Sequence, residues 1–561
     1  MTYDLKITGG TIVDGTGKAG FSGDLAIKDG KVVALGKAEG PAAETIDAAG
    51  QVVCPGFVDV HTHYDAQILW DRMLSISPWH GVTTTVIGNC GFGVAPTRAA
   101  HRKLVLQTLE KVEGMSLDAL HAGLGDDWPF ETFPQYLDAL EKSGSAINVA
   151  ALFGHTPLRL YVMGEESTER AATPDEISAM KKLVREAMEA GAIGFGTSVS
   201  VSHNGYAGKP VPSRQASVEE MDAMVSVLGE LKRGLMQITI GRDFSTRHMA
   251  DVSRKYGVPV TWTALLSYLY GPGGHRKQLD LAAEQRKAGA IVVPQVSCRP
   301  LNFEFTFAEP FIFDVMKFMN ELAAADAKAP GTRRRAYADP AWREKLRSEV
   351  TPLFRNWWER VVIAWAPSAR ELEEMPLAAA AARLGKDPVD LALDLALAND
   401  LQARFRMAVM NFDEGEVAEL ITDPNTIIAL SDAGAHASQL CDACYSTHLL
   451  GHWVRERKTF TLEQAVHNLT QRPAELFGIT DRGVLAEGRP ADVVVFDPST
   501  VGPGPLKRVY DLPAGADRLV SEASGIAAVI VNGELIRRDG KDAVAANGRL
   551  PGRLLRHGRA A

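Results

Sequence analysis

Residues 56–63 read GFVDVHTH, and this stretch decides the fold and the chemistry that we expect. An apolar strand ends here with two imidazoles, those of His61 and His63. Residues i and i+2 of a strand face the same side, so both rings point the same way at a strand terminus. Imidazole is the commonest metal ligand near neutral pH. Because a carboxylate, Asp65, follows the pair, we predict a metal site here rather than two surface histidines.

The composition indicates a globular protein without a basic surface. A chain of 561 residues exceeds one ordinary core, so two or three structural units are expected. Hydrophobic residues at 46% and charged residues at 23% are normal for such a protein. The net charge of -9 provides no basic surface for nucleic acid or for a membrane. We therefore expect no nucleic acid and no membrane as partners.

The cysteines and the N-terminus indicate a cytoplasmic location. Five cysteines, odd in number and scattered, argue for a reducing compartment and against a disulfide framework. Cys441 and Cys444 are spaced C-x-x-C, but without a second such pair they are interpreted as packing residues. The chain begins with alternating strand-like residues and not with a signal peptide. It contains no apolar run long enough to span a bilayer.

Short strands are predicted at both ends of the chain. In residues 1–54 they alternate with Asp-Gly turns, which are hairpin signals, and similar strands recur near the end. The predicted strands are 5–8, 11–13, 24–27, 31–35 and 51–53, then 491–496 and 527–533. Each set is too short for a core of its own. We expect residues 1–54 and 481–561 to join into one small β-sandwich, because each half then buries the face that the other exposes.

Between the two ends, apolar strands alternate with amphipathic helices such as 174–190. The predicted strands are 57–62, 83–89, 147–154, 192–198, 235–240, 258–264, 290–296 and 426–431. Strands that alternate with helices run parallel. The fold class is therefore α/β, and eight such strands favour a closed TIM-like (β/α)₈ barrel over residues 55–480. A doubly wound sheet is the alternative, but no G-x-G-x-x-G follows an early strand.

An insertion at about 299–400 separates the last two barrel strands. It is rich in phenylalanine, holds an Arg run at 333–335 and a Trp pair at 357–358, and continues with helical patterns. Insertions of this length are usually functional lids or subdomains. We interpret it as a lid over the barrel mouth, and a contact in a homo-oligomer is the alternative. Its aromatic residues suggest an apolar part of the substrate, although aromatic stripes are usually core.

In such a barrel the active site lies at the carboxyl ends of the strands. Strand one delivers His61 and His63, strand two Cys90 and strand eight Asp432. A zinc-type cation on nitrogen, sulfur and oxygen ligands lowers the pKa of bound water from 15.7 to roughly 7. Asp432 is then placed to take the proton of that water and to return it to a leaving amine. Alternatively, Cys90 is a small buried side chain and Asp432 caps the next segment.

Other strand ends supply candidate substrate contacts. These residues follow strands three, four, seven and eight, and they are His155, Arg159, His203, Arg299 and His436. His155 and His203 are also candidate metal ligands, although loop histidines more often contact substrate or solvent.

At this point the sequence resembles a known family. Residues 55–63 resemble the first-strand signature of the amidohydrolase superfamily, and 431–434 (SDAG) its eighth-strand aspartate segment. Residues 81–91, GVTTTVIGNCG, are similar to the second-strand segment of the N-acyl-D-amino-acid deacylases, or D-aminoacylases. In these, a cysteine replaces the bridging carboxylated lysine of many relatives, and strand four here, IGFGTS at 193–198, indeed has no lysine. The tail at 481–498 resembles the family's return into the β-sandwich.

One departure from the family concerns the metal count. The resemblance implies two further metal histidines at the ends of strands five and six, but residues 235–241 and 258–264 contain none. The nearest later ones are His248, in a predicted helix, and His275, after a Gly-Pro-Gly-Gly loop. We therefore expect one Zn²⁺ held by His61, His63 and Asp432, with Cys90 as a further ligand. The second ion stays an open question.

The resemblance implies a metal-dependent amide hydrolase that deacylates N-acyl-D-amino acids or related N-acyl amides, so the expected partner is a small-molecule substrate. Such a substrate releases an amino acid with a carboxylate, which an arginine binds best. Arg159, Arg299 and Arg214 are the candidates. A cyclic-amide hydrolase or a deaminase of the same superfamily is the first alternative, because the barrel alone does not separate them. A metal-free, non-catalytic scaffold is the second.

Overall fold

The structure is a computed structural model that describes residues 2–241, 244–314, 316–349, 351 and 354–560. The chain divides into two compact units. The first comprises Met1–Leu265, Arg276–Cys298 and Ala418–Ala561, and the second Leu266–His275 and Arg299–Val417. Among the described residues, no helix combines the length and the apolar character needed to cross a bilayer.

The first unit contains an eight-stranded parallel sheet, in the order β16-β12-β11-β10-β9-β8-β7-β6. Its strands are β6 (Phe57–Asp59), β7 (Val82–Ile87), β8 (Asn148–Gly154), β9 (Gly194–Ser198), β10 (Leu235–Thr239), β11 (Val260–Thr263), β12 (Val292–Val296) and β16 (Ile427–Ile428). The two edges of the sheet meet through a parallel bridge between Thr62 and Ala433. All eight predicted strands are present, each somewhat shorter than predicted.

Helices follow the strands, as alternation along the chain predicts. They include α1 (Arg102–Glu113), α2 (Leu117–Leu124), α3 (Phe133–Ser143), α4 (His155–Met163), α5 (Pro174–Ala190), α6 (Val218–Leu231), α7 (Thr246–Tyr256), α8 (Gly274–Lys287), α14 (Glu414–Thr422), α15 (Tyr445–His448), α16 (Leu462–Leu469) and α17 (Gln471–Leu476). Helix α5 has the predicted bounds. It begins with a capping box between Thr173 and Glu176, with proline at its first position, and Gly191 follows its last residue.

The parallel strands are buried on both faces, which is typical of parallel strands covered by helices. Every residue of β7, β8 and β9 is buried. One core cluster combines Val58, Val86 and Leu152 from the strands with Ala474 and Phe477 from the segment around α17. This packing fixes the strand ends that carry the polar side chains.

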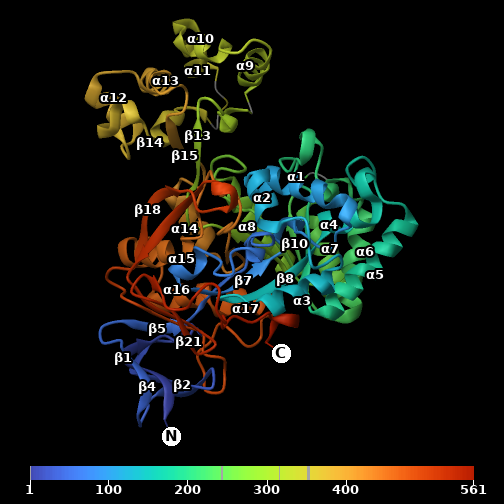
Figure 1. The fold of residues 1–561 in the computed structure, drawn as a ribbon, viewed down its shortest axis with the longest axis vertical. Helices are drawn as coiled ribbons and strands as arrows, with labels where there is room; N and C mark the ends of the chain where they lie inside the picture. Colours follow the sequence, from blue (N-terminus) through green and yellow to red (C-terminus); the bar gives the residue numbers. More distant parts are fainter. Residues whose placement is uncertain (1, 242–243, 315, 350, 352–353, 561) are drawn as a thin grey trace. The chain divides into compact units, whose positions relative to one another are not determined.

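Both ends of the chain contribute strands to one nine-stranded sheet, in which blue and red strands lie together in Figure 1. Its strands are β1 (Tyr3–Ile12), β2 (Phe21–Lys28), β3 (Lys31–Gly36), β4 (Ala42–Asp47), β5 (Val52–Pro55), β17 (Val493–Phe496), β20 (Ile526–Val531), β21 (Glu534–Arg538) and β22 (Lys541–Asp542). The two ends join where β5 runs antiparallel to β17. A separate hairpin pairs β18 (Gly502–Val509) with β19 (Arg518–Ser524).

This sheet differs from the prediction in several details, among them β21 and β22, which were not predicted. The segments 5–8 and 11–13 form the single strand β1, because its pairing with β2 continues past Gly9 with a register shift. Strand β4 was not predicted. It has one buried residue, Ile46, among partly or fully exposed neighbours, so it lacks the apolar alternation that marks a strand, and it is held by parallel pairing with β1.

The second unit holds the insertion and has its own aromatic core. Three antiparallel strands, β13 (Leu301–Thr306), β14 (Val361–Trp365) and β15 (Arg404–Met410), lie with β15 in the centre. Its helices are α9 (Lys317–Lys328), α10 (Thr332–Ala338), α11 (Pro340–Ser348), α12 (Leu377–Leu384) and α13 (Pro388–Ala398). Phe307 and Trp357 are fully buried in this core. The aromatic residues therefore form the core of this unit. This agrees with the interpretation of aromatic stripes as core rather than as a surface for the substrate.

Candidate metal centre

Strand β6 ends two residues before His61, and main-chain hydrogen bonds join residues 61–63 to the segments on both sides. The Thr62 N–H donates to the carbonyl of Val86 (3.3 Å), and the His63 N–H donates to that of Ala433 (2.7 Å). The two rings face the same region, with centroids 5.3 Å apart. Both side chains are buried. The strand register therefore sets the direction of both imidazoles before any cation is considered.

Cys90 comes from the turn after β7, and its backbone has a left-handed conformation with φ of 55°. Such a conformation is unfavourable for a residue with a Cβ and often marks a functional site. The Cys90 N–H donates to Gln237 Oε1 at 2.6 Å, which holds the turn. The next residue must be glycine, because a Cβ on Gly91 would lie 2.6 Å from the carbonyl oxygen of Gly196.

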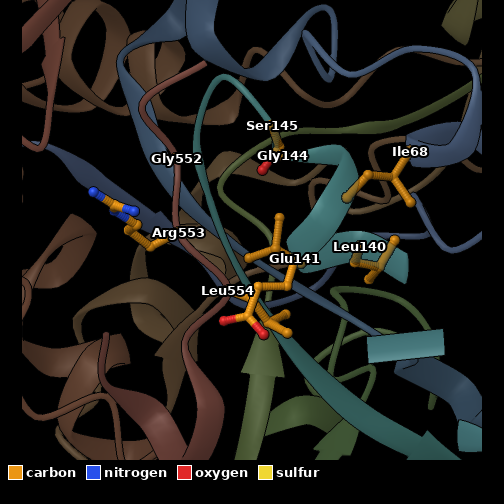
Figure 2. A pocket seen from close by; sticks show the side chains of 9 residues that line it. Ile68, Leu140, Glu141, Gly144, Ser145, Gly552, Arg553 and Leu554 are labelled. Atoms are coloured by element: carbon orange, nitrogen blue, oxygen red, sulfur yellow. The ribbon is translucent and has the colours of Figure 1, made fainter. Parts of the chain in front are cut away.

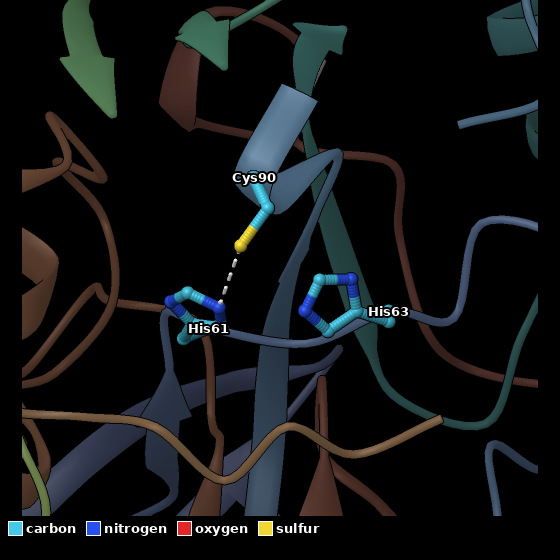
Figure 3. Close-up of side chains that lie close together, drawn as sticks. All are labelled: His61, His63 and Cys90. Carbon is cyan, nitrogen blue, oxygen red and sulfur yellow. Dashed lines mark hydrogen bonds between the residues drawn. The ribbon is translucent and has the colours of Figure 1, made fainter. Parts of the chain in front are cut away.

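The three side chains converge. One ligand atom from each of His61, His63 and Cys90 lies within 4.8 Å of the others, and Figure 3 shows the three pointing toward one another. The Cys90 Sγ is 3.5 Å from His61 Nε2. Asp432 completes the group, since its Oδ1 is 3.3 Å from His61 Nε2 and 3.8 Å from His63 Nε2. The strand ends one, two and eight therefore meet at one point.

These spacings fit a tetrahedral zinc ion. Zinc bonds of about 2.0–2.3 Å to nitrogen, oxygen and sulfur separate neighbouring ligand atoms by roughly 3.3–3.6 Å. The Sγ–Nε2 and Oδ1–Nε2 distances at His61, 3.5 and 3.3 Å, lie in that range, and the 3.8 Å between Asp432 Oδ1 and His63 Nε2 lies just above it. Two imidazoles, a thiol and a carboxylate are also the donor types that zinc prefers. The donor set therefore fits one zinc-type cation.

Electrostatics favour the ligand form of Cys90. Burial opposes the thiolate, but the neighbouring His61 and His63 rings outweigh it and lower the pKa of the thiol to about 7. The same contacts act in reverse on His61, whose pKa rises because of the Cys90 and Asp432 charges despite its burial. A divalent cation can replace the imidazole protons as the positive partner of the buried thiolate.

Sequence reasoning missed Glu113. It is the last residue of α1, and its Oε1 lies 3.1 Å from His63 Nδ1. Both groups are buried. Metal-binding histidines usually present their other ring nitrogen to such a carboxylate, which orients the ring and raises its basicity. No local pattern identifies Glu113, because 23 residues separate it from Cys90 and only the path of α1 brings it here.

His203 and His436 lie beside the cluster. The His203 Nδ1 is 2.7 Å from Ser198 Oγ, and its ring packs against Phe92 at 5.2 Å between centroids. Phe92 in turn lies 6.4 Å from the ring of His63. Burial and the charges of His436 and His63 lower the pKa of His203 to about 3, so its ring is neutral. Burial likewise lowers the pKa of His436. Both rings are suited to hydrogen bonding.

His155 and Arg159 belong to a different network. The His155 Nε2 is 2.7 Å from Glu220 Oε1, and its Nδ1 is 2.8 Å from Thr197 Oγ1. The Arg159 guanidinium pairs with the other oxygen of Glu220, and all three side chains are fully buried. The structure therefore does not bring His155 and Arg159 together with the cluster, because Glu220 uses their polar atoms inside the core.

The two remaining arginine candidates differ in position. Arg299 begins the main segment of the second unit, where its carbonyl accepts a hydrogen bond from Asn411 (2.7 Å). Arg214 belongs to the first unit and is partly buried. It donates to the carbonyl of His203 at 3.0 Å and to Asn204 Oδ1 at 2.5 Å. Arg214 is thereby fixed next to a ring that borders the cluster.

A separate cavity of about 100 Å³ lies at the other end of the strands (Figure 2). It is bordered by Leu140 and Glu141 of α3 and by the C-terminal residues Gly552 and Arg553. The nearby pairing of Val149 with Leu554 places it where β8 begins. In parallel barrels this end serves stability and the opposite end serves chemistry, and we assign it no catalytic role.

Fold and site together define a class of hydrolases that bind a cation at the carboxyl ends of a parallel eight-stranded sheet. Within that class, the chain belongs to the amidohydrolase family, because a sequence profile of that family matches residues 44–266 and 349–537. The family that the sequence motifs resemble is thereby confirmed.

Relatives of nearly equal length make the relationship more specific. D-aminoacylase from Alcaligenes xylosoxydans xylosoxydans is 30% identical over 95% of this chain and 94% of its own length. The structure of N-acyl-D-glutamate deacylase from Bordetella bronchiseptica, complexed with zinc and a phosphonate mimic of the tetrahedral intermediate, matches with a TM-score of 0.66. It is 28% identical, and the match covers 99% of this chain and all of that one.

A third relative concerns the number of metals. A D-aminoacylase structure matches with a TM-score of 0.66 and 27% identity over 99% of both chains. That structure concerns a binuclear metal centre, with activation by one metal and attenuation by the second. In the present chain, the described ends of β10, β11 and β12 direct Gln237, Thr263 and Gln295 toward the cluster region, and none of these is a histidine.

Cys90 provides the first test of the centre. We expect Cys90→Ala to weaken zinc binding by about 100-fold or more, because it removes a ligand rather than an outer contact, whose loss costs 10–100-fold. The measurement is competition for zinc with a chelating dye. Cys54→Ala is the matched control, since Cys54 is equally buried but lies in β5. Equal zinc affinity in both variants would contradict the assignment of Cys90 as a ligand.

Proposed function

We propose that the chain hydrolyses the amide bond of N-acyl-D-amino acids with one zinc ion held by His61, His63, Cys90 and Asp432. The observation that carries the proposal is the convergence of His61, His63 and Cys90, with Asp432 Oδ1 in contact with both histidines, at the carboxyl ends of strands one, two and eight. The relatives support the substrate class, because D-aminoacylase and N-acyl-D-glutamate deacylase match over almost the whole chain.

When bound, a zinc ion supplies Lewis acidity: it polarises the substrate carbonyl and lowers the pKa of water to near 7. The chain supplies the rest. Asp432 Oδ1 faces both histidines, so it is placed to accept the proton of the attacking water. As the carbon–nitrogen bond breaks, Asp432 returns that proton to the amine. One C–O bond forms, one C–N bond breaks, and the carboxylate is regenerated.

Around this point, His203 and His436 are proposed as substrate contacts. His203 is neutral, because its pKa is lowered to about 3 by burial and by the neighbouring histidines. A neutral imidazole can donate or accept a hydrogen bond without adding charge to the site. His436 follows Asp432 by four residues and has a left-handed backbone with φ of 48°. Its Cα lies close to Gly114, the residue that follows α1.

Arg214 is proposed as the anchor for the substrate carboxylate. Its guanidinium is fixed by the His203 carbonyl and by Asn204, and neither partner neutralises its charge. In contrast, Arg159 is paired with the Glu220 carboxylate. An arginine with an uncompensated charge binds a carboxylate through charge-assisted hydrogen bonds.

We also propose the domain boundaries that the sequence predicts. Residues 1–54 and 481–561 form a small β-sandwich, and residues 55–480 form the closed barrel, interrupted by the insertion. The nine-stranded sheet and the Thr62–Ala433 bridge support this division. The second compact unit, which includes Arg299–Val417, supports an insertion that extends beyond residue 400.

A substrate panel tests the reaction. We expect zinc-loaded protein to release amine from N-acetyl-D-amino acids, including D-methionine, D-glutamate and D-aspartate, with the L enantiomers cleaved at least ~10-fold more slowly, a difference of about 1.4 kcal/mol in activation free energy. Hydantoin and dihydrouracil test the cyclic-amide alternative. Chelator should abolish the release. A protein that holds stoichiometric zinc but cleaves only the cyclic amides would reject the deacylase function, and one that holds no zinc would favour a scaffold.

Asp432→Asn tests the proton transfer. The amide cannot accept and return a proton, so kcat should fall by about 10²–10⁴-fold, the usual contribution of general acid–base catalysis. Zinc content, measured on the same sample, should stay near one per chain because three ligands remain. A variant that keeps zinc and more than a tenth of the parent kcat would exclude Asp432 as the proton carrier.

Arg214→Met tests the anchor. Loss of a charge-assisted hydrogen bond is worth about 1.5–3 kcal/mol, so KM should rise by roughly 10–150-fold while kcat changes little. The control substrate is the corresponding N-acyl amino-acid amide, which lacks the carboxylate and should be indifferent to the variant. Arg185→Met, at an exposed arginine paired with Glu230, is the control variant. If Arg214→Met raises KM equally for both substrates, the anchor is elsewhere.

A further inference from the structure

Three neutral side chains lie behind the metal ligands and join two of them. Gln237 is in β10, Thr263 ends β11 and Gln295 is in β12. All three are buried, and the two glutamines are fully so. Buried amides are costly to leave without hydrogen bonds. Their partners therefore indicate what they are for.

Their hydrogen bonds run without interruption from Cys90 to His61. The Cys90 N–H donates to Gln237 Oε1 (2.6 Å), and Gln237 Nε2 donates to Thr263 Oγ1 (3.1 Å). The Thr263 hydroxyl donates to Gln295 Oε1 (3.0 Å), which also lies 2.6 Å from His61 Nδ1. The backbone of one ligand is thus connected to the ring of another by neutral groups alone.

Main-chain groups at both ends of this hydrogen-bond network fix which atom donates and which accepts in each of its hydrogen bonds. At one end, the Cys90 N–H can only donate, so Gln237 must turn its oxygen toward it and its NH₂ group toward Thr263. At the other end, the hydroxyl of Thr261 donates to the Val293 carbonyl at 3.0 Å.

The Thr261 oxygen is then left as an acceptor, and Gln295 Nε2 donates to it at 3.2 Å. Gln295 must therefore present its oxygen to His61. Because that oxygen can only accept, the hydrogen of a neutral His61 ring is on Nδ1. Its lone pair is then on Nε2, the atom that lies 3.5 Å from Cys90 Sγ and 3.3 Å from Asp432 Oδ1.

We propose that Gln237, Thr263 and Gln295 are positioning residues that fix the Nδ1–H tautomer of His61 and the backbone of Cys90, so that both ligands are set before the cation binds. The inference rests on the proposed metal centre. It also assigns the two histidines different supports, because His61 has a neutral amide at Nδ1 while His63 has the Glu113 carboxylate.

Two substitutions of Gln295 separate this role from a merely structural one. Gln295→Leu removes the acceptor and should weaken zinc binding by 10–100-fold, as loss of an outer-shell partner does. Gln295→Glu keeps an oxygen that accepts the Nδ1 hydrogen, so zinc affinity should stay within about threefold of the parent or increase, given the basicity that a carboxylate adds. Both are measured by competition with a chelating dye, and the visible spectrum of the cobalt-loaded protein reports the ligand geometry.

Asn468→Leu is the matched control, because Asn468 is a buried amide of α16 that bonds to Gln464 and Arg472. Its zinc affinity should equal that of the parent. Thr263→Val, which removes only the bridging hydroxyl, serves if Gln295→Leu does not fold, and should weaken zinc binding by several-fold.

Three outcomes overturn the inference or its basis. Parent-like zinc affinity and cobalt spectra in Gln295→Leu, or in Thr263→Val in its place, would show that the network does not position the ligands. If Gln295→Glu loses as much affinity as Gln295→Leu, the amide presents its NH₂ group to His61 and the tautomer assignment is wrong. If the parent binds no zinc, the metal centre itself fails, whereas a parent that binds zinc without cleaving amides contradicts the proposed function and leaves this inference standing.

Discussion

The site depends on the register of the parallel sheet around strand one. Two main-chain hydrogen bonds, from Thr62 to Val86 and from His63 to Ala433, join the end of this strand to strands two and eight. A slip of one residue would turn both imidazoles to the other face, because side chains alternate along an extended segment. The apolar strands are thus more than a core. They bring Cys90 and Asp432 to the same level as the histidines.

The turn at Cys90 adds an unfavourable conformation that the rest of the structure must hold. A left-handed backbone at a residue with a Cβ costs about 1–3 kcal/mol. The hydrogen bond from the Cys90 N–H to Gln237 Oε1 and the close approach of Gly91 to Gly196 hold this turn. The result is a thiol aimed at two imidazoles, which lower its pKa to about 7 in spite of burial. Backbone strain and electrostatics therefore serve the same end, a sulfur ready to bind a cation.

The sequence predicts the parts of this design that repeat along the chain and misses those that depend on a distant element. Strand periodicity placed His61, Cys90 and Asp432 at strand ends, and barrel geometry then predicted that they meet. Glu113 reaches His63 only through the path of α1, and no spacing rule describes that path. Arg159 looked like a substrate arginine because it follows strand three. Its partner Glu220 is 61 residues away, so the pairing could not be inferred.

The absence of histidine at the described ends of strands five and six has a physical counterpart. Gln237, Thr263 and Gln295 fill that side of the site with groups that carry no charge and whose oxygens are already engaged. An imidazole at these positions would add a metal ligand, whereas a glutamine amide that is hydrogen-bonded to a ligand restricts the orientation of that ligand. In the proposed centre, one cation with four donors would need no bridging group, because zinc can expand from four to five ligands and so take up one water. On the proposed function, the neutral network would preorganise the ligands of a single ion, and proton transfer would fall to Asp432 and the water.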